Sequence, residues 1–274
     1  MITVDCKSND RWLELSLAAL RFDGCALVLN VLDNHQIEET RAALYRTRER
    51  IELDIGADRL RAAGELGVLR LMLRYEPHFL RLLELPEVLA IVDGYVAETA
   101  VLHLQNGLIL PPMPDGERAD VFQTRFHRDF PRILNGSVLS VNTFFAVDEF
   151  TEDNGGTLVV PGTHQIEPPP SDDYLLERAE RAVCPAGSLI VFDSTLLHAA
   201  GQNYSDRDRC AINQQFTRSY VKQQVDYVRA LGDSFVEQQE PRTQQLLGWY
   251  TRVVTSLDEY YRPADQRLYR SGQG

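Results

Sequence analysis

Apolar side chains recur at helical spacing through most of the first hundred residues, so we expect this part of the chain to be mainly helical. Asp10 can cap the first helix, and either Asp33 or Asn34 can cap the second. Pro86 suits the first turn of a later helix. The apolar run at 25–30 is short, which predicts a buried strand. The expected helices cover 10–22, 35–50, 68–83 and 86–98, with a loop or short helix at 51–66.

Near residue 100 the pattern changes to short strand-like runs that are separated by turn residues. Glycine, asparagine and proline mark the turns, as at 154–156 and 161–162. Many short strands at this spacing are typical of a sandwich or barrel, here of jelly-roll type. After Thr217 helical spacing resumes, and we expect the aromatic tail with Tyr260 and Tyr261 to pack against the barrel. The expected strands cover 101–110, 121–127, 136–147, 156–160, 188–193 and 209–217.

Three of these runs carry polar residues on one face and apolar residues on the other, because alternate residues of a strand point to opposite sides. This pattern predicts a barrel with a polar interior and an apolar outer face that helices cover. A small protein places polar groups inside a barrel mainly to hold a polar ligand. The residues that share the polar faces are Gln123, Arg125, His127 and Asp129; Ser140 and Asn142; and Arg209, Asn213 and Gln215.

The fold class that these patterns favour is α+β with a mainly β core. We expect a double-stranded β-helix, that is, a jelly-roll or cupin-like barrel, covered by N-terminal and C-terminal helices. A single domain would span 1–274. Its parts would be a helical cover over 1–100, a jelly-roll core over 101–218 and a C-terminal helical segment over 219–274.

Composition narrows the classes of partner. Acidic residues outnumber basic ones, 40 against 28, for a net charge of −12, which argues against binding to a nucleic-acid backbone. No apolar run approaches the ~20 residues of a membrane span, and the N-terminus lacks the pattern of a secretory signal. The cysteines form no CxxC pair and suit a reducing compartment. We therefore expect a cytoplasmic monomer or homodimer that acts on a small molecule and binds neither nucleic acid nor membrane.

His127 and Asp129 are spaced so that both side chains lie on the same side of a strand. His198 follows a separate strand-like run and can supply a third ligand. Two imidazoles and one carboxylate are the ligand set of non-haem Fe(II) oxygenases. A lone histidine beside phenylalanines is more often an ordinary core residue, and the His-x-Asp pair also occurs by chance. The second histidine is what favours a metal site.

Arg209 lies on the polar face of its strand, which we expect to point inward. It also belongs to the charged run 206–209, and an arginine in such a run is ordinarily a surface residue. A buried guanidinium needs an anionic partner, and its planar fork suits a carboxylate. Arg207 has the same parity but lies nearer the turn, so we rank it second. These residues predict an anion site on the polar face of the last strand.

At these positions the sequence resembles the phytanoyl-CoA dioxygenase family of Fe(II)- and 2-oxoglutarate-dependent oxygenases. The similar stretch runs from about residue 120 to about residue 217, and its separate motifs are specific when they are taken together. The motifs are Phe126–Asp129, Asp153–His164, Pro185–Asp193, His198–Ser205 and Arg209–Asn213.

The resemblance implies that His127, Asp129 and His198 bind Fe(II), and that Arg209 binds the distal carboxylate of the co-substrate 2-oxoglutarate. With O₂, such an enzyme oxidises a C–H bond of its substrate and releases succinate and CO₂. The family's halogenases replace the metal-binding carboxylate with a small residue, so the presence of Asp129 argues against halogenation. The single domain would then be catalytic.

Further site residues follow from inward parity and the layout of the family. The expected substrate is a small polar metabolite or natural-product intermediate. Trp249–Arg252 and Tyr260–Arg262 could close over the site as a lid or could simply pack. Two alternatives stay open: a cupin-type metalloenzyme that does not use 2-oxoglutarate, and a non-catalytic jelly-roll binding protein. The expected 2-oxoglutarate contacts are Gln123, Asn142 and Thr157, and the expected substrate contacts are Arg125, Phe130, Arg132 and Asn213.

Overall fold

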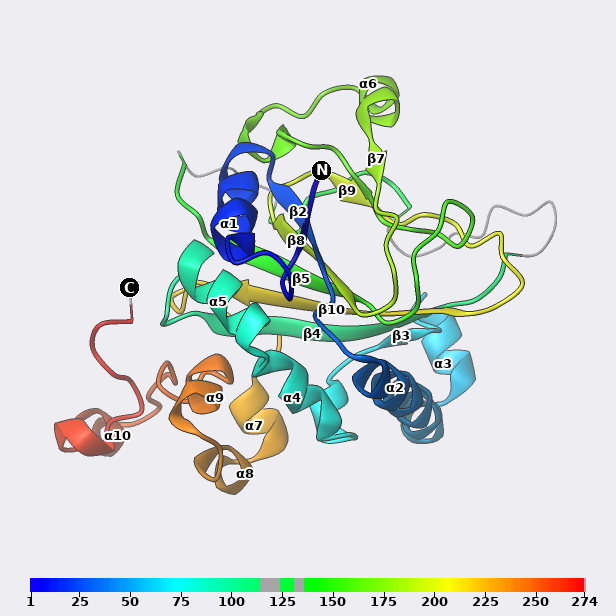
Figure 1. The fold of residues 1–274 in the computed structure, drawn as a ribbon. Coiled ribbons are helices and arrows are strands. Elements are labelled where there is room, and N and C mark those ends of the chain that lie inside the picture. The colour runs from blue at the N-terminus through cyan, green and yellow to red at the C-terminus, as the bar shows by residue number, and fades with distance from the viewer. Residues whose placement is uncertain (114–123, 131–135, 274) are drawn as a thin grey trace.

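The computed structural model describes residues 1–113, 124–130 and 136–273 (Figure 1). Its centre is a seven-stranded sheet in the order β1-β2-β8-β5-β10-β4-β3. The pair β1–β2 is parallel and every other pair in this sheet is antiparallel. The strands are β1 (Ile2–Asp5), β2 (Cys25–Leu29), β3 (Val68–Leu69), β4 (Val101–Leu110), β5 (Ser140–Ala146), β8 (Ser188–Asp193) and β10 (Arg209–Thr217).

A smaller three-stranded sheet, in the order β7-β6-β9, lies on one side of the large sheet (Figure 1). Phe144 and Phe192 of the large sheet pack with Val159 of the small one in a common apolar cluster. The fold is therefore mixed α+β with a mainly β core, while the full jelly-roll connectivity stays a prediction. The strands of the small sheet are β6 (Leu158–Val159), β7 (Glu180–Arg181) and β9 (His198–Ala199).

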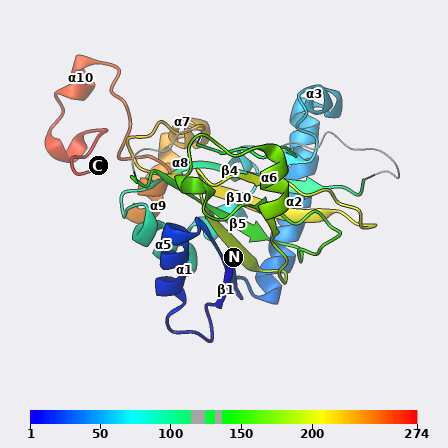
Figure 2. The same ribbon diagram turned by 90° about the horizontal axis from the view of Figure 1, so that it is seen from above.

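Helices cover the other side of the large sheet, as the two ribbon views show (Figure 1, Figure 2). The main apolar core lies between them and contains Val141, Phe145, Ile212 and Phe216 from β5 and β10. The described helices are α1 (Trp12–Phe22), α2 (Asn34–Ile55), α3 (Ala57–Ala62), α4 (His78–Leu83), α5 (Pro86–Tyr95), α6 (Asp172–Arg178), α7 (Tyr227–Leu231), α8 (Asp233–Glu237), α9 (Pro241–Leu246) and α10 (Leu257–Tyr260). Of these, α6 lies on the side of the small sheet, next to β7 (Figure 1). The 3₁₀ turns are η1 (Met72–Arg74), η2 (Thr163–Gln165) and η3 (Ala264–Gln266).

The start of α2 confirms the predicted cap. Asp33 accepts a hydrogen bond from the backbone of Gln36, and the Gln36 side chain accepts one from the backbone of Asp33. This reciprocal pair is a capping box, so Asp33 rather than Asn34 is the capping residue. The prediction for the first helix was wrong in its cap, because Arg11 precedes α1 and Asp10 makes no capping bond there.

The expected single helix at 68–83 was wrong in its first half. Val68 and Leu69 instead form β3, which pairs with Leu108 and Gly107 of β4. A Cβ at Gly107 would lie 2.6 Å from Leu44, 2.7 Å from Met72 and 3.1 Å from Leu69, so glycine at this position lets β3 and the helical cover pack closely without moving these side chains. The strand adds an edge to the large sheet that apolar spacing alone did not distinguish from a helix.

The two faces of β5 and β10 follow the predicted parity. Arg209 and Asn213 line a cavity, and Asn142 contacts Asn213 from the same face, whereas their neighbours of opposite parity join the helix-covered core. The helix-covered face is not wholly apolar, because buried Gln214 accepts a hydrogen bond there from Thr143. The polar interior that the sequence predicted is thus present.

The C-terminal segment projects from the rest of the fold at α10 (Figure 1, Figure 2). Trp249 packs against the main core, as expected. Tyr260 and Tyr261 are 61% and 74% exposed, so the prediction that this part of the tail packs on the barrel was wrong. Their rings contact each other instead, with centroids 5.4 Å apart.

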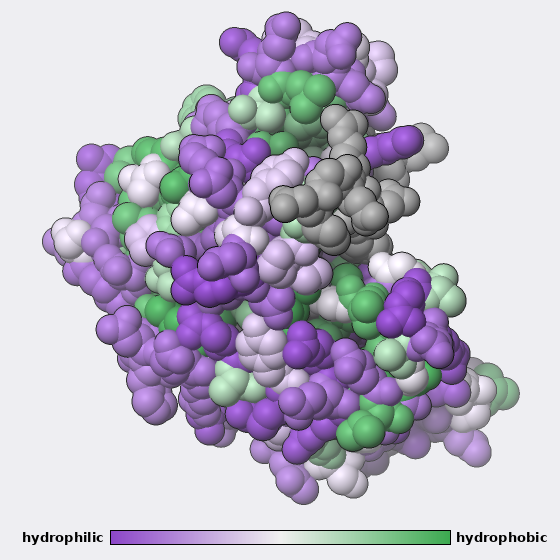
Figure 3. Space-filling model, turned by 90° about the vertical axis from the view of Figure 1, so that its right-hand side faces the viewer, coloured by the Kyte–Doolittle hydropathy of each residue, from purple (hydrophilic) through white to green (hydrophobic). Residues whose placement is uncertain are grey.

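Surface polarity agrees with the charged composition. The face in Figure 3 is mostly hydrophilic, with hydrophobic residues in small separate patches. Among the helices within 1–113, 124–130 and 136–273, none is long and apolar enough to cross a bilayer.

A candidate metal centre

Backbone pairing brings the two candidate histidines together. The amide of His127 donates to the carbonyl of His198 at 3.0 Å, and the amide of His198 donates back at 3.1 Å. The two imidazole rings therefore lie side by side, with centroids 4.3 Å apart. The predicted strand at 121–127 was wrong where the structure describes it, because residues 124–127 form only this single bridge.

The three predicted ligands converge around one point. One carboxylate oxygen of Asp129 lies 3.7 Å from Nε2 of His127 and 3.8 Å from Nε2 of His198. One ligand atom from each residue falls within 4.8 Å of the others. These separations are too long for hydrogen bonds but suit atoms that share a cation between them.

The tautomers of both histidines suit metal binding. Nδ1 of His127 lies 2.9 Å from the carbonyl of Arg125, and Nδ1 of His198 lies 2.9 Å from that of Leu196. A protonated Nδ1 that donates to a carbonyl leaves Nε2 as the lone-pair donor. Nε2 of His127 is buried and has no hydrogen-bond partner among the described residues. Burial, followed by the charge of His198, lowers the pKa of His127, which favours the neutral imidazole that a metal requires.

A hydrogen-bond chain orients the carboxylate. Asn142 donates to the second oxygen of Asp129 at 2.7 Å and also contacts the side-chain oxygen of Asn213 at 3.1 Å. Ser194 donates to the carbonyl oxygen of the Asn142 amide, and Ser140 lies 2.7 Å from the Ser194 hydroxyl. Asp129 thus presents one oxygen to the histidines while the other is held in place.

Arg128, between two of the candidate ligands, has a positioning role that the sequence did not reveal. Its guanidinium donates to the backbone carbonyls of Thr195, Thr163 and Ile166 at 2.7, 2.9 and 2.5 Å. These contacts tie the segment that carries His127 and Asp129 to the turn before His198. Backbone carbonyls that converge on one side chain have no signature in a single sequence.

Arg209 is buried beside the same cavity, with 4% of its surface exposed. It donates to the carbonyls of Asn154 and Gly155 at 3.4 and 3.1 Å, and its guanidinium lies 4.4 Å from the centre of the Phe150 ring. Its Nη1 is buried and finds no partner within the described part of the chain. Burial lowers the pKa of Arg209 to about 10. A cation held this way is suited to an anion that enters the cavity.

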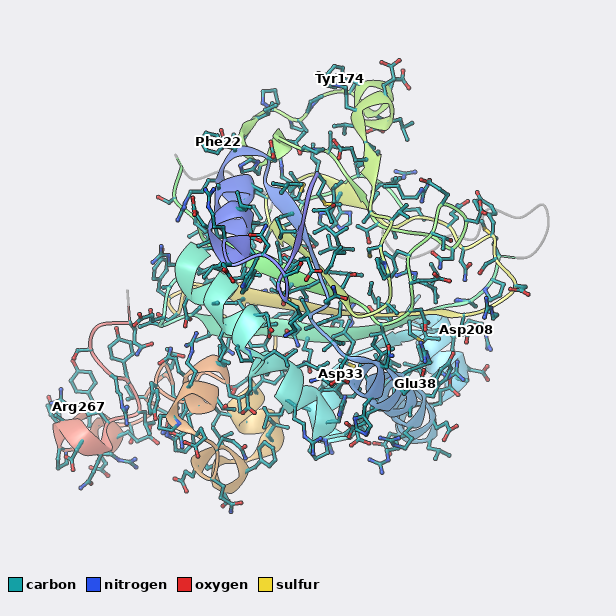
Figure 4. All side chains as sticks on the ribbon, in the orientation of Figure 1. Phe22, Asp33, Glu38, Tyr174, Asp208 and Arg267 are labelled. Atoms are coloured by element: carbon teal, nitrogen blue, oxygen red, sulfur yellow. The ribbon has the colours of Figure 1, made fainter. Side chains whose placement is uncertain are left out.

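The residue before Arg209 anchors the start of β10. Asp208, labelled in Figure 4, accepts a hydrogen bond from Tyr45 at 3.1 Å and lies 3.7 Å from the guanidinium of Arg48. Both partners belong to α2, so the charged run 206–209 is only partly a surface feature. Arg207 is 85% exposed in its side chain, which supports its lower rank.

The cavity has a volume of about 490 Å³ and is lined by all four main candidates, His127, Asp129, His198 and Arg209. Small-molecule sites usually occupy roughly 300–1,000 Å³. Thr157 and Asn213 also line the cavity, as the sequence predicted. The cavity wall therefore joins the candidate metal ligands to a buried cation.

Several other predicted site residues are not part of the described cavity wall. Arg125 is exposed, so the prediction that it points inward was wrong; its carbonyl is what serves the site, by contacting His127. Phe130 is partly buried, with its ring centre 5.7 Å from that of His103. Gln123 and Arg132 lie outside the described residues. Trp249 and its neighbours up to Arg252 are absent from the described cavity wall, which favours the packing alternative over a lid.

The His-Asp-His cluster has the donor set of a non-haem iron site, and comparison with known proteins identifies the family. The family model "Phytanoyl-CoA dioxygenase (PhyH)" matches residues 20–211. The chain belongs to this dioxygenase family and is thus an oxidoreductase of that class. The resemblance predicted from the motifs is confirmed.

The relatives include an uncharacterized protein of Mycobacterium tuberculosis (strain ATCC 25618 / H37Rv), which is 59% identical over the whole length of both chains. The dioxygenase cdmD of Talaromyces verruculosus is 32% identical over 174 residues, which cover 61% of this chain and 53% of the fungal protein. The similarity to a named dioxygenase is therefore confined to part of each chain.

Two solved structures share the fold. EctD from S. alaskensis, determined with 2-oxoglutarate and 5-hydroxyectoine, has a TM-score of 0.61 and 16% sequence identity, covering 73% of this chain and 74% of that one. The non-heme monooxygenase ThoJ, determined as a nickel complex, has a TM-score of 0.58 and 16% identity, covering 77% and 80%. At this identity the likeness concerns the fold.

Proposed function

We propose that this protein is an Fe(II)- and 2-oxoglutarate-dependent dioxygenase. It oxidises an unactivated C–H bond of a small polar metabolite or natural-product intermediate and releases succinate and CO₂. The whole of 1–274 would act as one catalytic domain built on a jelly-roll barrel. His127, Asp129 and His198 would hold the iron, and Arg209 would hold the distal carboxylate of 2-oxoglutarate.

The observation that carries this proposal is the buried Nη1 of Arg209, which has no partner among the described residues and belongs to the same cavity as the candidate metal ligands. A buried cation is costly without a counter-ion. A dicarboxylate that binds the metal at one end and Arg209 at the other would supply that charge. A metalloenzyme that does not use 2-oxoglutarate, or a non-catalytic barrel, gives no reason for this arrangement.

The donor set fits Fe(II). His127, Asp129 and His198 would hold the ion with the two imidazoles and one carboxylate that are typical of non-haem iron oxygenases. The bound iron and 2-oxoglutarate supply the oxidising chemistry. The protein orients the ligands through Asn142 and Arg128, and Arg209 would fix the co-substrate.

The test measures succinate formation and O₂ uptake by anaerobically purified, iron-loaded protein with and without 2-oxoglutarate. We expect both to require 2-oxoglutarate. Arg209→Ala should raise the KM for 2-oxoglutarate by about a hundredfold, because a bidentate, desolvated charge pair is worth roughly 2–5 kcal/mol. Arg207→Ala, at an exposed side chain, is the matched control and should leave the KM unchanged. O₂ uptake that is independent of 2-oxoglutarate would support the rival metalloenzyme instead.

A further inference from the structure

The cavity has two ends that lie on opposite sides of the metal site. Along β10, Arg209, Asn213 and Gln215 face the cavity. Asn142 contacts both Asp129 and Asn213, so Asn213 marks the level of the metal ligands. Arg209 lies four residues before Asn213, about 13 Å away along the strand at ~3.3 Å per residue, and Gln215 lies beyond it. If the co-substrate joins the metal to Arg209, the end near Gln215 is free for the substrate.

Two polar atoms near the Gln215 end are buried without a partner among the described residues. They are Nε2 of Gln215 and Nδ1 of His103. The Gln215 side chain is only 2% exposed, yet both residues line the cavity. Gln215 pairs with Leu104, next to His103, at a register irregularity between β4 and β10. Buried polar atoms usually have partners, so this pair is suited to a ligand that offers one.

The charged side chains of the described cavity wall are already engaged. Arg70 makes two hydrogen bonds to Glu65, at 2.7 and 2.9 Å. Arg128 donates to three backbone carbonyls. Asp129 and Arg209 belong to the metal and co-substrate sites. The wall that the structure describes therefore offers hydrogen bonds rather than a net charge to the substrate.

Aliphatic side chains form much of the cavity wall. Leu104 pairs with Gln215, is only partly buried and lines the cavity at this end. Leu108, which pairs with Ala211 and Val68, continues the wall on the other side of Asn213. Apolar surface of this kind gains free energy when a ligand's own apolar surface covers it. The wall suits a hydrocarbon skeleton rather than a fully hydroxylated one.

We propose that Gln215 and His103 bind the oxygen-bearing end of the substrate, and that this substrate is an uncharged molecule with an aliphatic skeleton and a hydroxyl or carbonyl oxygen. The amide of Gln215 donates to that oxygen, and Leu104, its strand partner, covers the adjacent part of the skeleton. This inference rests on the proposed function, because the co-substrate is taken to fill the Arg209 end.

The experiment measures binding to the full-length protein loaded with Ni(II) and 2-oxoglutarate, by the rise in its unfolding temperature with ligand concentration. The probes are four matched series on the same ring skeletons: cycloalkanols, cycloalkanones, cycloalkane carboxylates and cycloalkylamines, each of graded ring size. We expect the alcohols or ketones to bind and the carboxylates and amines to bind more weakly.

Variants locate the contact. Gln215→Leu should weaken binding of the best alcohol or ketone by about tenfold, which corresponds to ~1.4 kcal/mol. Gln215→Glu should shift the preference toward the amines, because it places a carboxylate at the same point. Gln238→Leu, at an exposed glutamine, is the control and should change neither value. His103→Phe should weaken the same ligand while it preserves the aromatic contact with Phe130.

Three results would contradict the proposed substrate contact. A preference for the charged series, no binding by any alcohol or ketone, or an unchanged profile in Gln215→Leu and Gln215→Glu would each overturn this inference. Succinate formation by the wild-type protein with iron and 2-oxoglutarate, measured without substrate, tests the proposed function separately from this binding assay. If the wild-type protein binds the neutral probes but never converts 2-oxoglutarate, the proposed function fails while the binding result stands.

Discussion

The two faces of the large sheet differ in what they do for the protein. The face toward the helices carries Val141, Phe145 and Ile212, which are fully buried in the main apolar core. The face toward the cavity carries Asn142 and Arg209, which are also buried but polar. The first face stabilises the fold by removing apolar surface from water. The second contributes less to stability and instead presents hydrogen-bonding groups and charge to a ligand. Alternate residues of the same strands therefore have different roles: one set stabilises the fold, and the other faces the cavity.

The largest effect is expected from a substitution at the candidate metal site on the cavity side. Asp129→Ala removes one metal ligand and should reduce both metal binding and 2-oxoglutarate turnover to background, because the two histidines alone cannot complete the triad. The unfolding temperature of the metal-free protein should change little. Metal titration of anaerobic protein, together with succinate assays, checks both points. Undiminished succinate release would contradict the assignment of Asp129.

A substitution on the helix-covered face should have the converse effect, with a loss of stability but little change in metal affinity. Phe145→Ala leaves a void among fully buried side chains and should lower the free energy of unfolding by about 3–5 kcal/mol. Metal affinity of the protein that remains folded should be close to that of wild type. Urea denaturation and metal titration on the same sample make the comparison. A large loss of metal affinity without loss of stability would show that the two faces are not separable.

Asn142→Leu sharpens the comparison, because it changes a residue that touches a candidate ligand but not the metal. The variant removes the hydrogen bond to Asp129 at similar side-chain volume. We expect metal affinity to fall by roughly tenfold to a hundredfold, the usual consequence of losing a ligand's hydrogen-bond partner. Asn142→Asp offers no donor when ionised and should not restore it. An affinity equal to that of wild type would remove Asn142 from the site.

Arg128→Ala should have a smaller effect of the same kind. The variant loses the donors that hold three carbonyls around the site, and metal affinity should fall by about tenfold or less. Arg128→Lys keeps the charge but not the fork geometry, so it should recover only part of the loss. The absorption spectrum of Co(II)-substituted protein reports the ligand geometry directly. A spectrum that is unchanged in Arg128→Ala would argue for a purely structural role.

The smallest expected effect concerns pH. Burial lowers the pKa of His78, on the helical side, and that of His103, at the cavity. Both are therefore harder to protonate when the protein is folded, so the metal-free protein should lose stability as pH falls below about 6.5, the ordinary histidine value. Thermal unfolding between neutral and mildly acidic pH measures this, and His78→Gln should flatten the dependence. No change in slope would exclude His78 as a contributor.

Much of the fold could be predicted because it depends on local patterns. Asp33 with Gln36 is a capping signal within four residues, and the parity of Asn142 and Arg209 follows from strand alternation. The error at Val68 had a physical cause: an apolar pair is equally compatible with a helix and with an edge strand, and pairing with β4 decides between them.

The site was only partly visible for a different reason. His127, Asp129 and His198 carry a recognisable chemistry, so the sequence identified all three. Arg125 was placed inward because a regular strand was assumed, whereas the described segment is irregular. The contacts of Arg128 are to backbone carbonyls at distant positions, and backbone atoms leave no mark in the sequence. The candidate metal ligands could be predicted from the sequence, whereas the long-range hydrogen bonds could be identified only in the structure.

The mutual backbone hydrogen bonds of His127 and His198 couple two stretches of chain that are far apart in sequence. Phe130 adds a third amide bond to the same partner stretch, through the carbonyl of Ser194. An ion that bridges the imidazoles would hold this short ladder closed from its side-chain edge as well. Solvent deuterium should then enter these three amides more slowly in the metal-loaded protein, so occupancy of the centre could be followed from the main chain alone.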